Sequence, residues 1–263
     1  MKFFLSAILA LTITACNNET GNSNGPENNS DNQTKSSIEK GSKADGNCGS
    51  NLLFQEGAQI KTESYDGDGK VIAKQVSAIT KVYDEGGMSV SEWEIKNTDQ
   101  DGSNEKTMTA VYRCDGKQLF VDMTSFLTDS KQNNDIQTSG LQFPFNPSVG
   151  ETLPDFDYST TISNAGKARK IKSHIRDRKV EAKETLITAA GSFECYKISS
   201  VIEAETEMPD MDEESKKIME QVKKKMGKNR MTFWYAPDVT IIKMEFKMGD
   251  KLVMRSEVTE IKK

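Results

Sequence analysis

The chain is dominated by short β-prone runs separated by turn residues, and this pattern limits the fold more than any other feature. Residues 58–65 and 71–83 flank Asp66-Gly67-Asp68-Gly69, which predicts a hairpin. The later runs carry β-branched and aromatic residues in partial alternation, as strands with one buried face do. They are predicted at residues 88–96, 107–113, 118–123, 157–162, 169–178, 180–188, 192–204, 231–235, 239–248 and 251–261. Consecutive strands joined by short turns predict an antiparallel meander.

A proline-containing segment separates the two halves of this meander. Residues 141–150 contain Pro144 and Pro147, which exclude a central strand. We expect a crossover in which Phe143 and Phe145 cap an open end of the core. Because hydrophobic residues make up only 35 % of the chain and charged residues 29 %, the core is expected to be thin. Such a composition favours a sheet with one solvent-exposed face.

One amphipathic helix is predicted near residues 211–226. Asp210 can cap its first turn, Glu213 lies at the third helical position, and Gly227 follows its end. Its apolar stripe, with lysines elsewhere around the axis, consists of Met211, Ile218, Met219, Val222 and Met226. We expect the stripe to pack on the sheet; a lid over a cavity and contact with anionic headgroups or a partner are the alternatives. The predicted fold is therefore mainly β, an antiparallel curved sheet or an open or half barrel of about ten to twelve strands with this one helix.

The first residues predict export and lipidation. Residues 1–15 carry one lysine and an apolar run too short to span a bilayer, and they end in Ile13-Thr14-Ala15 before Cys16. This is the arrangement of a bacterial lipobox, in which Cys16 is lipidated; the alternative is an ordinary signal peptide with an incidental cysteine. The polar residues 17–47 cannot offset their ordering entropy and predict a disordered tether. The expected organisation is a signal peptide at 1–15, a lipidated cysteine and tether at 16–47, and a β-rich domain at 48–263.

The charge and the residue after the cysteine indicate where such a protein would act. A net charge of −5 gives no attraction to nucleic acid. Asn17 replaces the aspartate that would favour retention in the inner membrane. We therefore expect a lipid-anchored protein of the bacterial cell envelope, at the outer membrane, on its periplasmic or surface face.

Three cysteines remain once Cys16 is assigned to the lipid. In an oxidising compartment we expect one disulfide among Cys48, Cys114 and Cys195, and the sequence leaves all three pairings open. The remaining thiol is expected to be a small buried side chain.

The chain offers little for catalysis. His174 is the one histidine, which nearly excludes Ser-His-Asp, Cys-His and multi-histidine metal chemistry. It is expected to be a surface or hydrogen-bonded residue. Asp155 and Asp157 alternate with Phe156 and Tyr158, where aromatic rings can stack a sugar, but a solvated strand edge is the favoured interpretation. We expect no catalytic residue and no cofactor; a hydrolase is the remote alternative.

One loop has part of a calcium-binding pattern. Residues 97–102 place oxygen side chains at the first, third and fifth positions and glycine at the sixth. Met108 stands at the twelfth position, where calcium needs a bidentate carboxylate. A hairpin turn rich in Asx residues is favoured, and no metal site is expected.

Two stretches near the C-terminus resemble a known group. The first stretch is residues 191–198, Gly-Ser-Phe-Glu-Cys-Tyr-Lys-Ile, and the second is residues 233–243, Phe-Trp-Tyr-Ala-Pro-Asp-Val-Thr-Ile-Ile-Lys. Together they are similar to the G-x-F-x-C-Y-K … W-Y-A-P-G-V-G-L-V-K pattern of TapB-like envelope lipoproteins. This is a largely uncharacterised group common in Bacteroidota. Residues 112–123 and 147–153 fit the same pattern, although Asp238 and Thr240 replace its turn glycines. The resemblance implies an open or half barrel akin to lipoprotein carriers of the LolA/LolB type, and it brings no catalytic residues.

These observations together predict a membrane-tethered, non-enzymatic binding lipoprotein. We expect that it can hold an apolar ligand under the predicted helix, since closed or half-closed barrels of this size can hold one small apolar molecule. The alternative is an interaction or structural module that binds an envelope protein, with the interior serving only as core.

Overall fold

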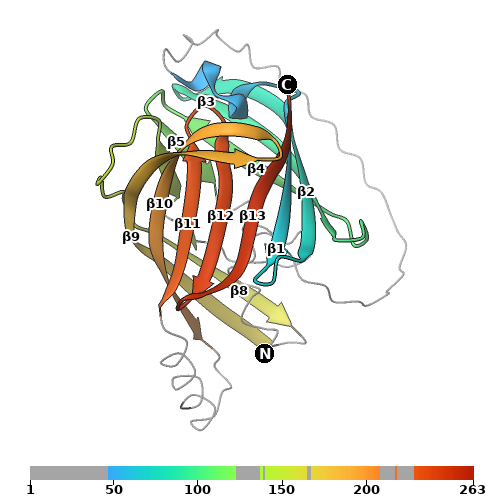
Figure 1. Cartoon of the computed structure of the whole chain (residues 1–263), viewed down its shortest axis with the longest axis vertical. Helices are drawn as coiled ribbons and strands as arrows, with labels where there is room; N and C mark the ends of the chain where they lie inside the picture. The colour runs from blue at the N-terminus through green and yellow to red at the C-terminus, as the bar shows by residue number, and fades with distance from the viewer. Residues whose placement is uncertain (1–46, 123–136, 139, 165–166, 208–216, 218–227) are drawn as a thin grey trace, which may run out of the picture.

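The computed structural model describes residues 47–122, 137–138, 140–164, 167–207, 217 and 228–263, which form one thirteen-stranded antiparallel sheet (Figure 1). Two short 3₁₀ helices, η2 (Asn47–Ser50) and η3 (Leu52–Phe54), precede the strands. The strands are β1 (Gln59–Asp66), β2 (Val71–Glu85), β3 (Met88–Asp99), β4 (Lys106–Cys114), β5 (Gln118–Asp122), β6 (Gln137–Thr138), β7 (Leu141–Pro144), β8 (Phe156–Asn164), β9 (Lys167–Thr188), β10 (Gly191–Glu207), β11 (Asn229–Ala236), β12 (Thr240–Met248) and β13 (Lys251–Lys262).

The sheet curves into an almost closed barrel whose seam lies between strands from the middle of the chain. The spatial order is β6-β8-β9-β10-β11-β12-β13-β1-β2-β3-β4-β5-β7. The last strand, β13, pairs with the first, β1, so the two ends of the domain meet inside the sheet (Figure 1). The edges of the sheet are β7 on one side and β6 with β8 on the other. The expectation of a curved antiparallel sheet or open barrel is confirmed.

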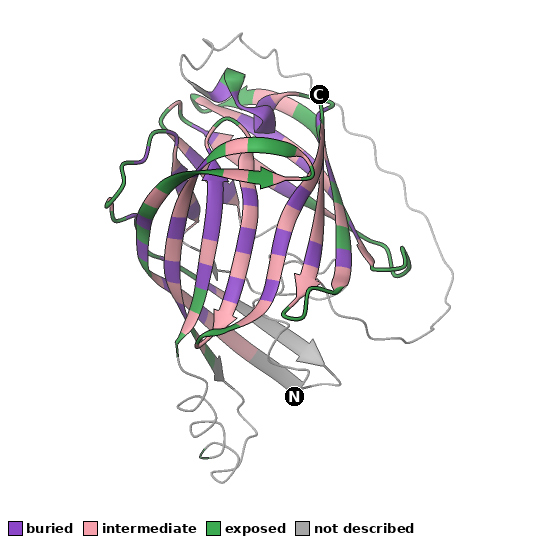
Figure 2. Ribbon diagram, in the orientation of Figure 1, coloured by how far each residue is buried: buried purple, intermediate pink, exposed green. Residues whose placement is uncertain are grey.

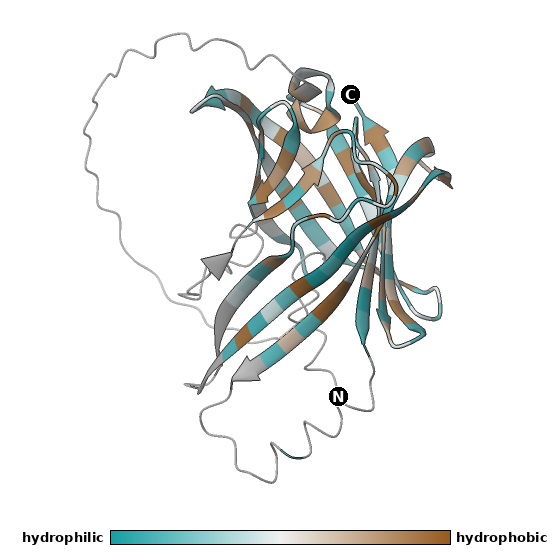
Figure 3. Ribbon diagram, turned by 90° about the vertical axis from the view of Figure 1, so that its left-hand side faces the viewer, coloured by the Kyte–Doolittle hydropathy of each residue, from teal (hydrophilic) through white to brown (hydrophobic). Residues whose placement is uncertain are grey.

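Alternation along the strands produces the core. In β5, Leu119 and Val121 are buried between half-buried neighbours, and in β13 Met254 and Val258 are buried in the same way. Figure 2 shows this alternation of buried and less buried residues around the barrel, and Figure 3 shows the matching alternation of hydropathy. The inward-facing side chains form one continuous apolar cluster.

The predicted hairpin between β1 and β2 is present, and its turn packs closely against β13. Asp66 Oδ1 accepts from the backbone N–H groups of Asp68 and Lys70 at 3.0 and 2.9 Å. A Cβ atom at Gly67 would lie 2.3 Å from the carbonyl oxygen of Leu252, so any other residue would push β13 away. Glycine is therefore required here by contact between two hairpins.

The segment with the two prolines lies at the seam. Its first four residues form β7, which pairs only with β5 and thus places Pro144 on an edge, where no N–H is needed. Phe143 and Phe145 are both buried in the core, as expected.

Residues 145–155 then cross the gap between the two edges. The Gly150 N–H donates to the Val180 carbonyl at 2.8 Å, and the Val180 N–H returns a bond to Glu151 at 2.9 Å. The Leu153 N–H donates to the Arg178 carbonyl at 2.8 Å. These bonds tie the crossover to β9 and narrow the opening of the barrel.

The hairpin of β9 and β10 is long, 22 and 17 residues, and its turn end curves over the outside of the barrel across β11 and β12 (Figure 1). It covers a second, smaller apolar cluster whose buried members are Cys195, Trp234, Ala236 and Ile242, packed against Leu186, Phe193 and Val239. The Trp234 indole N–H donates to the Glu184 carboxylate at 2.5 Å. Trp234 thus fills an outer core under the hairpin, and its neighbour Tyr235 fills the barrel interior.

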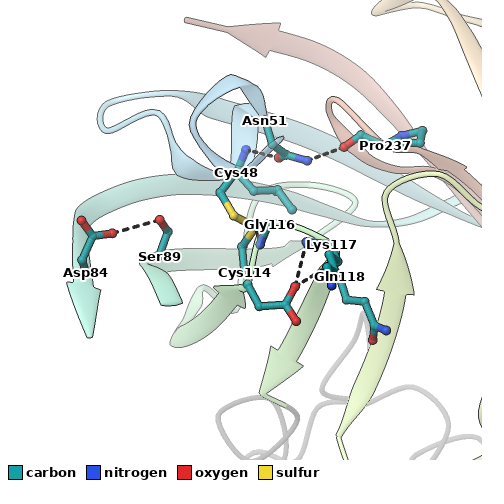
Figure 4. Close-up of a disulfide and its surroundings, with 11 residues drawn as sticks. Cys48, Asn51, Asp84, Ser89, Cys114, Gly116, Lys117, Gln118 and Pro237 are labelled. Atoms are coloured by element: carbon teal, nitrogen blue, oxygen red, sulfur yellow. Dashed lines mark hydrogen bonds between the residues drawn. A yellow bond between two sulfur atoms is a disulfide. The ribbon is translucent and has the colours of Figure 1, made fainter. Parts of the chain in front are cut away.

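The N-terminal 3₁₀ helices lie at one end of the barrel (Figure 1), where a disulfide attaches them to the sheet (Figure 4). A disulfide joins Cys48 in η2 to Cys114 at the end of β4, which resolves the three possible pairings and leaves Cys195 as a free, buried thiol. Asn51 caps η3 by accepting from the Leu53 N–H at 2.7 Å, and its amide donates to the Pro237 carbonyl. The entry segment is thereby attached both to β4 and to the turn between β11 and β12.

Two details differ from the sequence-based expectations, and some predictions concern residues outside the described ranges. The strands predicted at 169–178 and 180–188 are one strand, β9, in which Asp177 adopts a φ of 53° and the pairing with β10 shifts register, so the break is a bulge. Thirteen strands form instead of ten to twelve, because the short β6 and β7 also pair. The helix predicted at 211–226 falls outside the described residues, except for Lys217, and Cys16 and residues 17–46 also lie outside them.

Candidate functional site

The barrel interior contains a partly open cavity of about 130 Å³. Its lining comes from η3 and from nine strands, β1 to β5, β7 and β11 to β13, so segments from both ends of the chain contribute. A cavity of similar size, made in a protein core and lined by apolar side chains, admits benzene. The interior therefore has room for a small ring or a short aliphatic segment, but not for a whole lipid.

One part of the lining is aromatic. Trp93 on β3 lies beside Tyr112 on β4, with ring centroids 5.4 Å apart. Phe143 on β7 stacks on Tyr235 of β11 at 5.0 Å and meets Phe233 edge-on at 5.9 Å. We call these five residues the aromatic wall. Such rings provide large apolar surfaces with little freedom to reorient.

The wall contains two tyrosines, of which Tyr235 is fully buried and Tyr112 is half-buried. Burial raises the pKa of Tyr112, and burial together with the charge of Asp238 raises that of Tyr235, so both remain protonated at neutral pH. The Tyr235 hydroxyl is buried and has no hydrogen-bond partner among the described residues. An unsatisfied buried hydroxyl costs folding free energy. Such hydroxyls are unusual in protein cores and more common in binding sites.

The lining contributed by β13, β1 and β2 includes four polar but uncharged side chains beside the apolar Ile60 and Val258. Thr62, Gln75, Ser77 and Ser256 line the cavity there, and we call them the polar wall. Thr62 and Gln75 are direct partners in the register of β1 and β2. The Gln75 amide donates to the Ser77 hydroxyl at 2.9 Å, and Ser256 exchanges a 2.7 Å hydrogen bond with Ser64.

A buried arginine holds the seam next to the cavity. Arg178 of β9 is 1 % exposed and donates to the carbonyl of Gln142 in β7 at 2.8 Å and to that of Pro154 at 2.6 Å. Its guanidinium lies 5.5 Å from the ring centre of Phe143 and 5.6 Å from that of Phe156. Burial lowers the pKa of Arg178 to about 10, against a weaker opposing effect of Asp155. Arg178 thus joins the two edges of the sheet through its side chain, where backbone pairing ends.

The residues around His174 form an ionic cluster on the outer face. His174 Nδ1 lies 2.7 Å from Asp157 Oδ1, and Arg176 contacts the same oxygen at 2.5 Å. Partial desolvation raises the pKa of Asp157, but these two hydrogen bonds outweigh it and hold the pKa below its usual value. Phe156 and Tyr158 point the other way, into the core, so they cannot stack a sugar beside Asp157. The interpretation of His174 as a hydrogen-bonded residue is confirmed.

The remaining sequence candidates are structural. In the loop after β3, Asp101 accepts from the Ser103 N–H at 3.0 Å and Asn104 donates to Asp99 at 2.7 Å, which is the expected Asx-rich turn. Burial raises the pKa of the Cys195 thiol to about 12, as expected of an unreactive core cysteine. Within the described residues, no three His, Cys, Asp or Glu side chains gather closely enough to hold a metal ion. The same residues contain no helix with the length and hydropathy needed to cross a membrane.

Sequence reasoning missed the polar wall and Arg178. Thr62 and Gln75 look like ordinary strand residues, and only the pairing of β1 with β2 and β13 brings them beside Ser77 and Ser256. Arg178 was one of several basic residues in a charged run; the bulge at Asp177 turns it into the barrel.

Comparison with known proteins supports this fold. The family model for DUF3108-like proteins matches residues 55–258. A putative exported protein with a YmcC-like fold from Bacteroides fragilis has a similar structure, with a TM-score of 0.59 and 21 % identity over 81 % of this chain and 98 % of its own. A putative lipoprotein from Parabacteroides distasonis is similar at a TM-score of 0.57 and 17 % identity, over 80 % of this chain and 97 % of its own. No curated protein matches the sequence.

Proposed function

The chain belongs to the DUF3108-like family, and we propose that it is a lipid-anchored envelope protein that binds a small, largely apolar ligand inside its barrel without catalysing a reaction. The cavity of about 130 Å³ is the observation that carries this proposal. Protein cores are normally packed with few voids larger than a water molecule, so a cavity of this size beside five aromatic rings is suited to a guest.

The anchoring part of the proposal rests on the sequence. The lipobox ending in Cys16 and the polar residues 17–47 supply a lipid anchor and a tether. The names of the two similar structures, an exported protein and a lipoprotein, support an envelope location. Placement at the outer membrane, favoured by Asn17, belongs to the same proposal.

The curved sheet with an interior cavity also supports the likeness to TapB-like lipoproteins and to carriers of the LolA/LolB type. The volume, however, favours a ligand of about the size of benzene over a complete lipid. The interaction-module alternative has less support. The exposed large hydrophobic residues in the described part of the chain lie on three different segments: Val76 on β2, Val149 in the connection between β7 and β8, and Ile187 on β9.

Titration with toluene tests the proposal directly. Ser77 faces the cavity and its neighbour Val76 faces solvent, so the same strand offers a matched pair. Ser77→Phe places a ring in the cavity, while Val76→Phe adds similar bulk outside. Calorimetric titration should show saturable toluene binding by the wild type and by Val76→Phe, and none by Ser77→Phe.

The fold of each variant is checked by circular dichroism and thermal unfolding. If Ser77→Phe does not fold, Val121→Phe fills the cavity from β5 and replaces it. Absence of toluene binding by the wild-type protein, or equal binding by a folded cavity-filled variant, would refute the proposed site.

A further inference from the structure

The polar wall has a chemical character that a simple apolar pocket lacks. Its four side chains come from three neighbouring strands and are all neutral hydrogen-bonding groups. A purely structural core would place aliphatic residues here, because buried polar groups cost free energy unless they are hydrogen-bonded. Their grouping on one side of a cavity whose other side is the aromatic wall indicates a ligand with both a polar group and an apolar part.

These side chains retain hydrogen-bonding capacity. A serine hydroxyl can donate one bond and accept two. Ser77 accepts from Gln75, and this leaves its own O–H available. The Ser64–Ser256 pair uses one O–H of its two, and when Ser64 is the donor, the O–H of Ser256 can donate to a guest in the cavity. The polar wall can therefore both donate to and accept from one ligand group.

The charges around the cavity indicate that this group is neutral. Lys243 is the one charged residue among the described residues that line the cavity. Its ammonium lies 2.9 Å from Glu245 and 4.6 Å from the ring centre of Trp234, in the outer cluster. No opposite charge among the described residues of the interior would therefore compensate the charge of an ionised ligand. Its binding would cost a large desolvation free energy.

We propose that the ligand is a neutral, mainly apolar molecule with one hydroxyl or carbonyl oxygen, which hydrogen-bonds to Thr62, Gln75 or Ser77 while the apolar part contacts the aromatic wall. This inference rests on the proposed binding function and specifies its ligand class. Phenols, small alcohols and ketones belong to this class; fatty acids and amines do not.

Toluene and phenol form a suitable pair of probes, because phenol carries a hydroxyl group where toluene carries a methyl group and the two are otherwise identical. A dry apolar cavity prefers toluene, since phenol must give up its hydrogen bonds to water. The polar wall should make phenol bind at least as tightly as toluene, as measured by calorimetry on the intact protein.

The double variant Thr62→Val/Gln75→Met removes polar atoms with little change of shape. It should weaken phenol binding about 3- to 10-fold, the value of about one neutral hydrogen bond, and leave toluene binding nearly unchanged. Thr109→Val makes the same exchange on the exposed side of β4 and should affect neither probe.

The outcomes separate the two proposals. Binding of toluene but not phenol, or phenol binding that the double variant does not weaken, overturns the ligand class and leaves the apolar site intact. Failure of both probes to bind the wild type overturns the proposed function, and the ligand class with it.

Discussion

Arg178 allows a test of how the barrel closes, because exchanging it for methionine, lysine and alanine separates its charge from its bulk. The guanidinium makes two hydrogen bonds to carbonyls across the seam, at 2.6 and 2.8 Å. Hydrogen bonds to a charged group contribute about 1.5–3 kcal/mol each, so the pair contributes about 3–6 kcal/mol.

Burial of the charge opposes this contribution. The fall of the Arg178 pKa from 12.5 to about 10 corresponds to about 3 kcal/mol that disfavours the charged, folded form. Arg178→Met removes both effects and keeps most of the apolar volume, so we expect a loss of stability of about 0–3 kcal/mol. Arg178→Ala also leaves a cavity and should cost about 2–5 kcal/mol.

Lysine is the informative exchange. It keeps a buried charge, but its ammonium is more strongly hydrated and cannot reach two carbonyls in the fixed geometry of a guanidinium fork. Arg178→Lys should therefore be less stable than Arg178→Met, although it conserves charge. Urea unfolding followed by circular dichroism gives the three free energies. If lysine is tolerated better than methionine, the charge itself stabilises the seam and this reasoning is wrong.

Four further variants test other parts of the account. Trp234→Ala should lower stability by about 3–5 kcal/mol, because the ring fills the outer cluster, and a loss below about 1 kcal/mol in urea unfolding would contradict this placement. Exchange of Cys48 and Cys114 for serine opens a loop of 66 residues and should cost up to about 4 kcal/mol in the same assay, whereas an unchanged midpoint would argue against the disulfide. Tyr235→Phe removes a buried hydroxyl without a partner among the described residues and should leave the thermal midpoint unchanged or higher; a clear fall would reveal a partner. Cys16→Ser should move the folded protein from the membrane pellet to the soluble fraction, and retention in the pellet would refute lipid anchoring.

The strands and most turns could be predicted because their signals are local. Asp66 to Lys70 form the tight turn that Asp-Gly residues favour, and the alternation around Trp93 and Leu119 gives the buried face. Pro144 correctly predicted that its segment is not a central strand.

The site could not be predicted, because it depends on contacts between distant segments. The polar wall forms only in the observed pairing register of β1 with β2 and β13. In this register Thr62 of β1 is paired with Val258 of β13, almost two hundred residues away in the sequence. The break predicted near Lys179 was wrong because the charged residues around Asp177 form a bulge within one strand. The same bulge turns Arg178 inward, which no periodicity of the sequence indicates. The long hairpin that covers Trp234 on the outside of the barrel could not be inferred from composition.

The central claim is that the barrel interior holds a small neutral guest, and native mass spectrometry of the protein purified from bacterial envelopes tests it most directly. We expect a reproducible added mass of a small molecule on the wild type, released by organic extraction and absent from Ser77→Phe. A clean mass of the unliganded chain for the wild type, or the same added mass on a folded Ser77→Phe, would contradict it.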